Sequence, residues 1–161
     1  FGALLVTFMA CSNPTEEGDA KRWPKPPPLP ASRIAIPPDL SIAVTLDGTP
    51  RPAITTATLR EARPDFADAD RRAWRIASIV VGTESGDAIE ASSTAGIAVR
   101  FHHPVYQPVL FLTRRGEVIV ALVDPKDPFP NHHGQGGRLR RPGDSMPRVE
   151  KVTKLSIQRA P

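Results

Sequence analysis

The prolines restrict this chain more than any other feature, because seven of its 19 prolines fall between residues 24 and 38. Proline fixes its own φ and lacks a backbone N–H, so such a stretch forms neither a helix nor a sheet ladder. Apart from Trp23, residues 12–38 contain few large apolar side chains. We expect an extended tether there, of about 3.1 Å per residue, rather than a proline-rich ligand for an aromatic groove.

The only cysteine, Cys11, follows an apolar run from Phe1 to Ala10. About ten residues match the core of a signal peptide and fall short of the roughly 20 that span a bilayer. Phe8-Met9-Ala10-Cys11 resembles a bacterial lipobox, in which the thiol is acylated and the chain is cut before it. We therefore expect lipidation of Cys11, with the protein anchored in the cell envelope and facing the periplasm or the exterior. The alternatives are an ordinary secretory signal and a buried strand with an inert thiol.

An acylated Cys11 leaves no thiol for a disulfide, a zinc–thiolate site or a nucleophile. The folded part must then be stabilised by its core alone. Residues 39–161, about 120 in number, are enough for one domain with a single core.

The first half of this domain shows strand and helix patterns in turn. Residues 41–46 alternate with period two and lead into the turn pair Asp47-Gly48, which predicts a half-buried strand. A short helix should follow. Its landmarks are the cap at Thr55 or Thr56, the inward-facing Leu59 and the terminating Pro64.

A longer helix is expected between Asp68 as its N-cap and Gly82 as its terminator. Four residues would form its apolar stripe and three arginines would lie outside it: Ala73, Ile76, Ala77 and Val80, against Arg71, Arg72 and Arg75. Trp74 borders the stripe. We interpret it as a core anchor rather than a platform for a ligand.

The second half is dominated by strand patterns. Strands are expected at 96–101, 109–112, 118–122 and 154–157. Residues 113–117 should form a hairpin turn in which Gly116 supplies a positive φ. The two runs beside this turn are apolar on both faces, which favours central strands covered by the helices. The predicted class is α+β, with a mainly antiparallel or mixed sheet and two short helices.

Residues 127–144 are rich in glycine and arginine. Glycines let backbone amides approach a ligand closely, and guanidinium groups suit phosphate or carboxylate. The predicted anion site consists of Gly134, Gly136, Gly137, Arg138, Arg140 and Arg141. The alternative is a surface loop that carries part of the net charge of +4.

Two pairs of adjacent histidines, His102-His103 and His132-His133, are the candidates for metal ligands. Neighbours on an extended chain point in opposite directions, so at most one of each pair could face a shared ion, and we expect no metal site. The sequence contains no recognisable Ser/His/Asp or paired-carboxylate arrangement. No catalytic residue is therefore predicted.

The order of motifs over about residues 40–145 resembles the oxidoreductase molybdopterin-binding domain of the sulfite oxidase type. The similar motifs are Val44-x-Leu46-Asp47-Gly48, a short helix around Leu59, Ala73-Trp74-Arg75-Ile76 with Ile79-Val80, a strand pair with an Arg-Gly turn, and Gly136-Gly137-Arg138-Leu139-Arg140-Arg141-Pro142-Gly143. In that family the tryptophan segment begins the helix beside the cofactor. A Gly-Gly-x-x-Arg-Leu-type loop lies near the pterin phosphate.

This chain departs from the active members of that family. Residues 66–72 contain no cysteine where the oxidases place their molybdenum ligand, and the only thiol belongs to the lipobox. We therefore expect no cofactor and no oxidase activity, but a non-redox relative that binds an anionic ligand or an envelope protein. The alternative is a molybdopterin-dependent redox accessory, or an oxidoreductase-like protein of the periplasm.

The C-terminal quarter is strongly basic. Its positive residues are Arg138, Arg140, Arg141, Arg148, Lys151, Lys154 and Arg159, against only Asp144 and Glu150. Such a surface favours anionic partners such as phospholipid headgroups. Nucleic acid is not an expected partner, because few aromatic residues are present to stack on bases.

Overall fold

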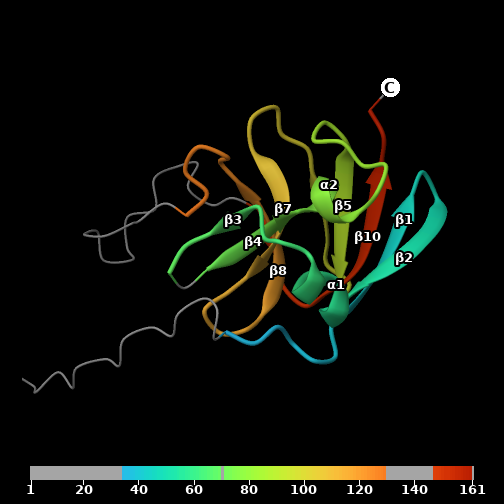
Figure 1. Ribbon diagram of the computed structural model, residues 1–161. Helices are drawn as coiled ribbons and strands as arrows, with labels where there is room; N and C mark the ends of the chain where they lie inside the picture. Colours follow the sequence, from blue (N-terminus) through green and yellow to red (C-terminus); the bar gives the residue numbers. More distant parts are fainter. Residues whose placement is uncertain (1–33, 70, 130–146, 161) are drawn as a thin grey trace, which may run out of the picture.

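The computed structural model describes residues 34–69, 71–129 and 147–160, which form two five-stranded sheets and two short helices (Figure 1). Sheet A runs in the order Thr49–Thr55 (β2), Ser41–Leu46 (β1), Val152–Gln158 (β10), Ala88–Ser93 (β5) and Ala98–Phe101 (β6). Sheet B runs in the order Phe66–Ala67 (β3), Arg72–Arg75 (β4), Gln107–Leu112 (β7), Val118–Val123 (β8) and Arg148–Val149 (β9). The helices are Thr56–Glu61 (α1) and Ile76–Ile79 (α2).

Strands β1 and β10 pair in parallel, and the other strand pairs named here are antiparallel. The predicted antiparallel or mixed β-structure with two short helices is confirmed, but the strands form two sheets where one was expected.

The core lies between the two sheets. Along β1 the side chains alternate between exposed and buried, and Ile42, Val44 and Leu46 point inward. They share one buried cluster with Trp74 of β4 and Leu110 of β7. Trp74 is 1 % exposed, and its indole Nε1 donates to the carbonyl of Ala62 at 2.9 Å. Its predicted role as a core anchor is confirmed.

A tight hairpin joins β1 to β2, as the Asp47-Gly48 pair predicts. Both residues have positive φ, 50° and 78°, which two-residue hairpin turns of this hand require. The sequence did not predict β2, because Pro50 and Pro52 argue against a strand. β2 tolerates them because it is the edge strand of sheet A, where a missing N–H leaves only an outward position unpaired.

The helix predicted from Asp68 is wrong over its first half. Residues 72–75 are strand β4, paired with β3 and β7, and only 76–79 are helical. Asp68 does accept the N–H of Arg71, at 2.7 Å, but within the β3–β4 turn instead of a helix cap. An aspartate that accepts an N–H three residues ahead serves both structures equally well, so the sequence signal was ambiguous.

The short helix α1 follows the prediction. Thr55 caps it, Leu59 is 1 % exposed, and the helix ends two residues before Pro64 is reached, at the cap Ala62. Leu59 and Ile76 of α2 both belong to the shared core. Both helices lie where the two sheets meet, as Figure 1 shows.

The hairpin of β7 and β8 is confirmed, with Gly116 at φ 77° and both strands inside sheet B. The expectation that helices cover these strands is wrong, because their core-side face packs mainly against sheet A, with Leu59 of α1 and Ile76 of α2 at its margin. The opposite face is covered by Phe129, which forms a second small cluster with Ala73 and Val109. Arg71 closes this cluster from outside, with its guanidinium carbon 4.8 Å from the Phe129 ring centre.

Residues 34–40, called here the N-terminal segment, pack against the core between the two sheets, although residues 34–38 were assigned to the tether. Ile34 and Ile36 are 7 % and 4 % exposed and belong to the shared core. Arg72 Nη2 donates to the Ile34 carbonyl at 2.6 Å, and the Thr56 hydroxyl donates to the Pro37 carbonyl. Five residues of the predicted tether are thus part of the folded structure.

Candidate functional site

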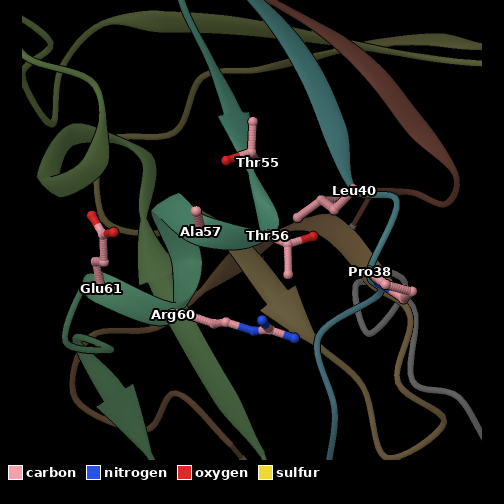
Figure 2. A pocket seen from close by; sticks show the side chains of 7 residues that line it. All are labelled: Pro38, Leu40, Thr55, Thr56, Ala57, Arg60 and Glu61. Atoms are coloured by element: carbon pink, nitrogen blue, oxygen red, sulfur yellow. The ribbon is translucent and has the colours of Figure 1, made fainter.

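A hollow lies between the N-terminal segment and α1 (Figure 2). We call it the α1 recess. It is lined by Pro38, Leu40, Thr55, Thr56, Ala57, Arg60 and Glu61, and its volume is about 550 Å³.

Hydrogen bonds fix the start of α1 in the wall of the recess. The Thr55 hydroxyl accepts the N–H of Thr58 at 3.3 Å, and the Thr58 hydroxyl accepts the N–H of Thr55 at 3.1 Å. This reciprocal pair is a capping box with threonine at both positions. The hydroxyl of Thr56 is bound to Pro37, which holds the N-terminal segment against the helix.

The chemistry of the recess is apolar on its walls and charged at its rim. Pro38, Leu40 and Ala57 supply the apolar surface, while Arg60 and Glu61 are exposed. In Figure 2 the Arg60 side chain extends toward Pro38, and Glu61 points another way. The recess therefore offers one positive and one negative group without an ion pair between them among the described residues. It contains no nucleophile with an adjacent base.

Hydrogen bonds from Arg75 and Ser78 to Asp65, called here the Asp65 clamp, stabilise the segment that follows α1. Asp65 accepts the backbone N–H of Arg75 at 2.8 Å, its Nε at 2.7 Å and the Ser78 hydroxyl at 2.9 Å. Burial raises the pKa of Asp65, but the bonds from Arg75 and Ser78 outweigh it and lower the pKa below its ordinary 3.8. The clamp ties the loop before β3 to the start of α2.

Arg72 lies beside the N-terminal segment in a partly desolvated position. Its guanidinium carbon is 5.7 Å from the Trp74 ring centre, and burial lowers its pKa. Its Nε is buried without a hydrogen-bond partner among the described residues. The bond from its Nη2 to the carbonyl of Ile34 holds the N-terminal segment against β4.

Of the two histidines that the structure describes, His103 has a structural role and His102 is exposed. The Nδ1 of His103 accepts the backbone N–H groups of Val105 and Tyr106, at 3.1 and 2.9 Å. Its ring also packs on that of Tyr106, with 4.4 Å between centres. Within the described ranges no three His, Cys, Asp or Glu side chains form a group that could hold a metal ion.

Cys11 and the six residues of the predicted anion site, 134–141, lie outside the described residues, as does the pair at 132–133. These groups therefore stay predictions. The structure brings together Leu40, Ala57 and Arg60, which the sequence did not single out. The capping pattern Thr55-x-x-Thr58 was the only local signal near them. None of the helices that the described residues form has the length and apolar character to cross a bilayer.

Searches for related proteins give no further clue to the site. No protein-family model, no curated protein and no solved structure matches the chain.

Proposed function

We propose that this protein is a lipid-anchored protein of the bacterial cell envelope whose folded part is a non-catalytic binding module for another envelope protein. The apolar run that ends at Ala10-Cys11 supports the anchor, and the proline-rich residues after it support the tether. The observation that carries the binding role is the α1 recess, a hollow of about 550 Å³ between the N-terminal segment and α1.

The composition of the recess defines the partner. Its two wall threonines are bound within the fold, so the contacts left to a ligand are apolar area and the two rim charges. A volume of about 550 Å³ accommodates one or two side chains of a peptide. The segment that fits is an extended peptide with an apolar side chain between charged residues. Its acidic group would contact Arg60 and its basic group Glu61.

The folded part is in our proposal a relative of the sulfite oxidase-type molybdopterin-binding domain. The order β1, turn, β2, α1 and the β7–β8 hairpin supports this proposal, whereas Trp74 lies in strand β4 and not at the start of a helix, where the resemblance places it. The residues present do not suit the metal of the active enzymes. Residues 66–72 offer no thiolate, and the Asp68 carboxylate there already binds Arg71, with Asp68 Oδ2 to Arg71 Nη2 at 2.6 Å. Metal and pterin analysis of the purified protein would detect the redox alternative directly.

Two experiments test the proposal. Expressed with a complete start in a lipoprotein-processing host, the protein should incorporate labelled fatty acid and partition into detergent, and Cys11→Ser should abolish both. A photo-crosslinking amino acid at Ala57 should then capture a discrete envelope protein. The same probe at Ala98, an equally exposed alanine on the outer face of sheet A, is the matched control.

The crosslink should disappear when Leu40→Asp places a charge in the recess. Equal crosslinking from positions 57 and 98, or a crosslink that survives Leu40→Asp, would contradict the binding role. Failure of fatty-acid labelling with a specific crosslink would contradict the anchor alone.

A further inference from the structure

A second hollow lies on the outer face of sheet A, at the end where β10 and β6 finish. We call it the basic hollow. Its volume is about 320 Å³, and it is lined by Arg100, His102, Gln158 and Arg159, together with the small residues Gly86 and Ala88. It shares no lining residue with the α1 recess.

The strand register explains why this space is open. Gln158 of β10 pairs with Ala88 of β5, and the Ile89–Phe101 pair places His102 beside Ala88 on its other side. Gln158, Ala88 and His102 therefore lie side by side across the sheet, with a long side chain at each end and the methyl group of Ala88 in the middle. Gly86 has no side chain, and the space beside it is open, since a Cβ there would meet no atom within 4 Å.

Two residues that line the hollow, Arg100 and Arg159, carry positive charge, and His102 and Gln158 add hydrogen-bonding side chains. Arg100 makes one contact within the described chain, in which its Nη2 donates to Gln158 Oε1 at 3.3 Å, and it forms no ion pair with a described carboxylate. Arg159 is held more loosely than a bidentate pair, with Nε 3.5 Å from Asp47 Oδ2 and both side chains about half exposed. Arg100 and Arg159 thus both line one small space, while the guanidinium of Arg159 also lies beside Asp47.

No carboxylate lines the basic hollow. Asp87 is 5 % exposed, and its oxygens accept the N–H groups of Glu84 and Ala160 at 2.8 and 3.1 Å. Glu90 is the cross-strand neighbour of Arg100 but makes no ion pair with it within the described ranges. The positive groups are therefore available to a ligand.

We propose that the basic hollow binds a phosphate monoester group. Such a group presents three oxygens and about −1.5 to −2 charges. It therefore uses donors from several directions, as Arg100, Arg159, His102 and the Gln158 amide supply them. The forked guanidinium of Arg100 contacts two of these oxygens at once. The source is either a soluble phosphorylated molecule or the headgroup of a phosphatidic acid-type lipid, which share this chemistry.

The test is an NMR titration of the full chain carrying Cys11→Ser, which removes any contribution from an acyl chain. Inorganic phosphate is titrated against chloride at equal ionic strength, because plain screening must not be mistaken for binding. The amide signals of Gly86, Ala88 and Ala160 should shift and saturate. Arg100→Gln should raise the Kd at least about tenfold, since it removes a charge-assisted contact.

The matched control is Arg115→Gln, an identical change at an exposed arginine in the β7–β8 turn, which should alter the Kd by less than about twofold. Ala88→Leu fills the hollow without changing any charge, and it should abolish the saturable shifts even if Arg100→Gln proves unstable. Shifts that do not saturate, an Arg115→Gln effect as large as that of Arg100→Gln, or unimpaired binding by Ala88→Leu would each overturn the site.

Vesicles distinguish the two sources of the phosphate group. If vesicles of phosphatidic acid and phosphatidylcholine sediment the protein, vesicles of phosphatidylcholine alone do not, and free phosphate competes, then the ligand is a headgroup. Saturable phosphate binding without sedimentation by either vesicle identifies a soluble ligand. Both results support the basic hollow as the site, and neither depends on the α1 recess.

Discussion

Shortening Ile36 to alanine tests whether the N-terminal segment is part of the domain or the end of a tether. Ile36 is 4 % exposed and packs in the core shared by both sheets. Replacing a buried isoleucine by alanine costs about 2–5 kcal/mol, from the lost transfer free energy and the cavity left behind. The segment lies at the margin of the core and can relax, so we expect a loss of about 3 kcal/mol in the free energy of unfolding.

Urea denaturation of the full chain, followed by tryptophan fluorescence, measures this loss as a lower midpoint at an unchanged m-value. The matched control is Ile97→Ala, the same deletion at a side chain that is 58 % exposed, which should change stability by less than about 0.5 kcal/mol. If Ile36→Ala were as mild as Ile97→Ala, the segment would be a tether as far as residue 38. The argument from burial would then be refuted.

Three further changes test other parts of the fold. The bonds from Arg75 lower the pKa of Asp65 despite its burial. The contribution of Asp65 to stability is therefore complete above its unfolded-state pKa and is lost as the pH falls through its lower folded-state pKa. Unfolding midpoints measured from pH 6 to pH 2 should decline less steeply for Asp65→Asn than for the unchanged protein. Trp74→Phe removes the hydrogen bond to Ala62 and part of the ring, and calorimetry should show a loss of about 2–3 kcal/mol. Gly116→Ala places a Cβ at φ 77° in the β7–β8 turn and should lower stability in urea by about 1–2 kcal/mol.

The sequence predicted those elements whose signals are local. The Asp47-Gly48 turn and the glycine turn of the β7–β8 hairpin require positive φ, and few residues other than glycine, asparagine and aspartate adopt it readily. Strand β5 was missed although its burial alternates, because alanine and serine predominate in it and favour strands weakly. In 72–75 the pairing with β3 and β7 overrides an apolar spacing that also suits a helix.

Neither hollow could be predicted from the sequence, for a physical reason. The α1 recess joins Leu40 to Arg60, and the basic hollow joins Gly86 and Arg100 to Arg159. Each set meets only through strand register and through the path of the N-terminal segment, which no local pattern records. The candidate anion site that the sequence did suggest, at 134–141, lies outside the described residues and stays a prediction.

The parallel pairing of β1 with β10 has a consequence for the order in which the protein is made. β10 lies between β1 and β5 in sheet A, and the Thr45 hydroxyl donates to Ser156 across a sequence separation of 111 residues. Synthesis from the N-terminus leaves β1 and β5 with unpaired edges until the last strand emerges, and such edges favour aggregation. Contacts this distant in sequence also slow folding. A chain that ends before residue 152 therefore lacks the strand that joins the two halves of sheet A and should not reach the native state.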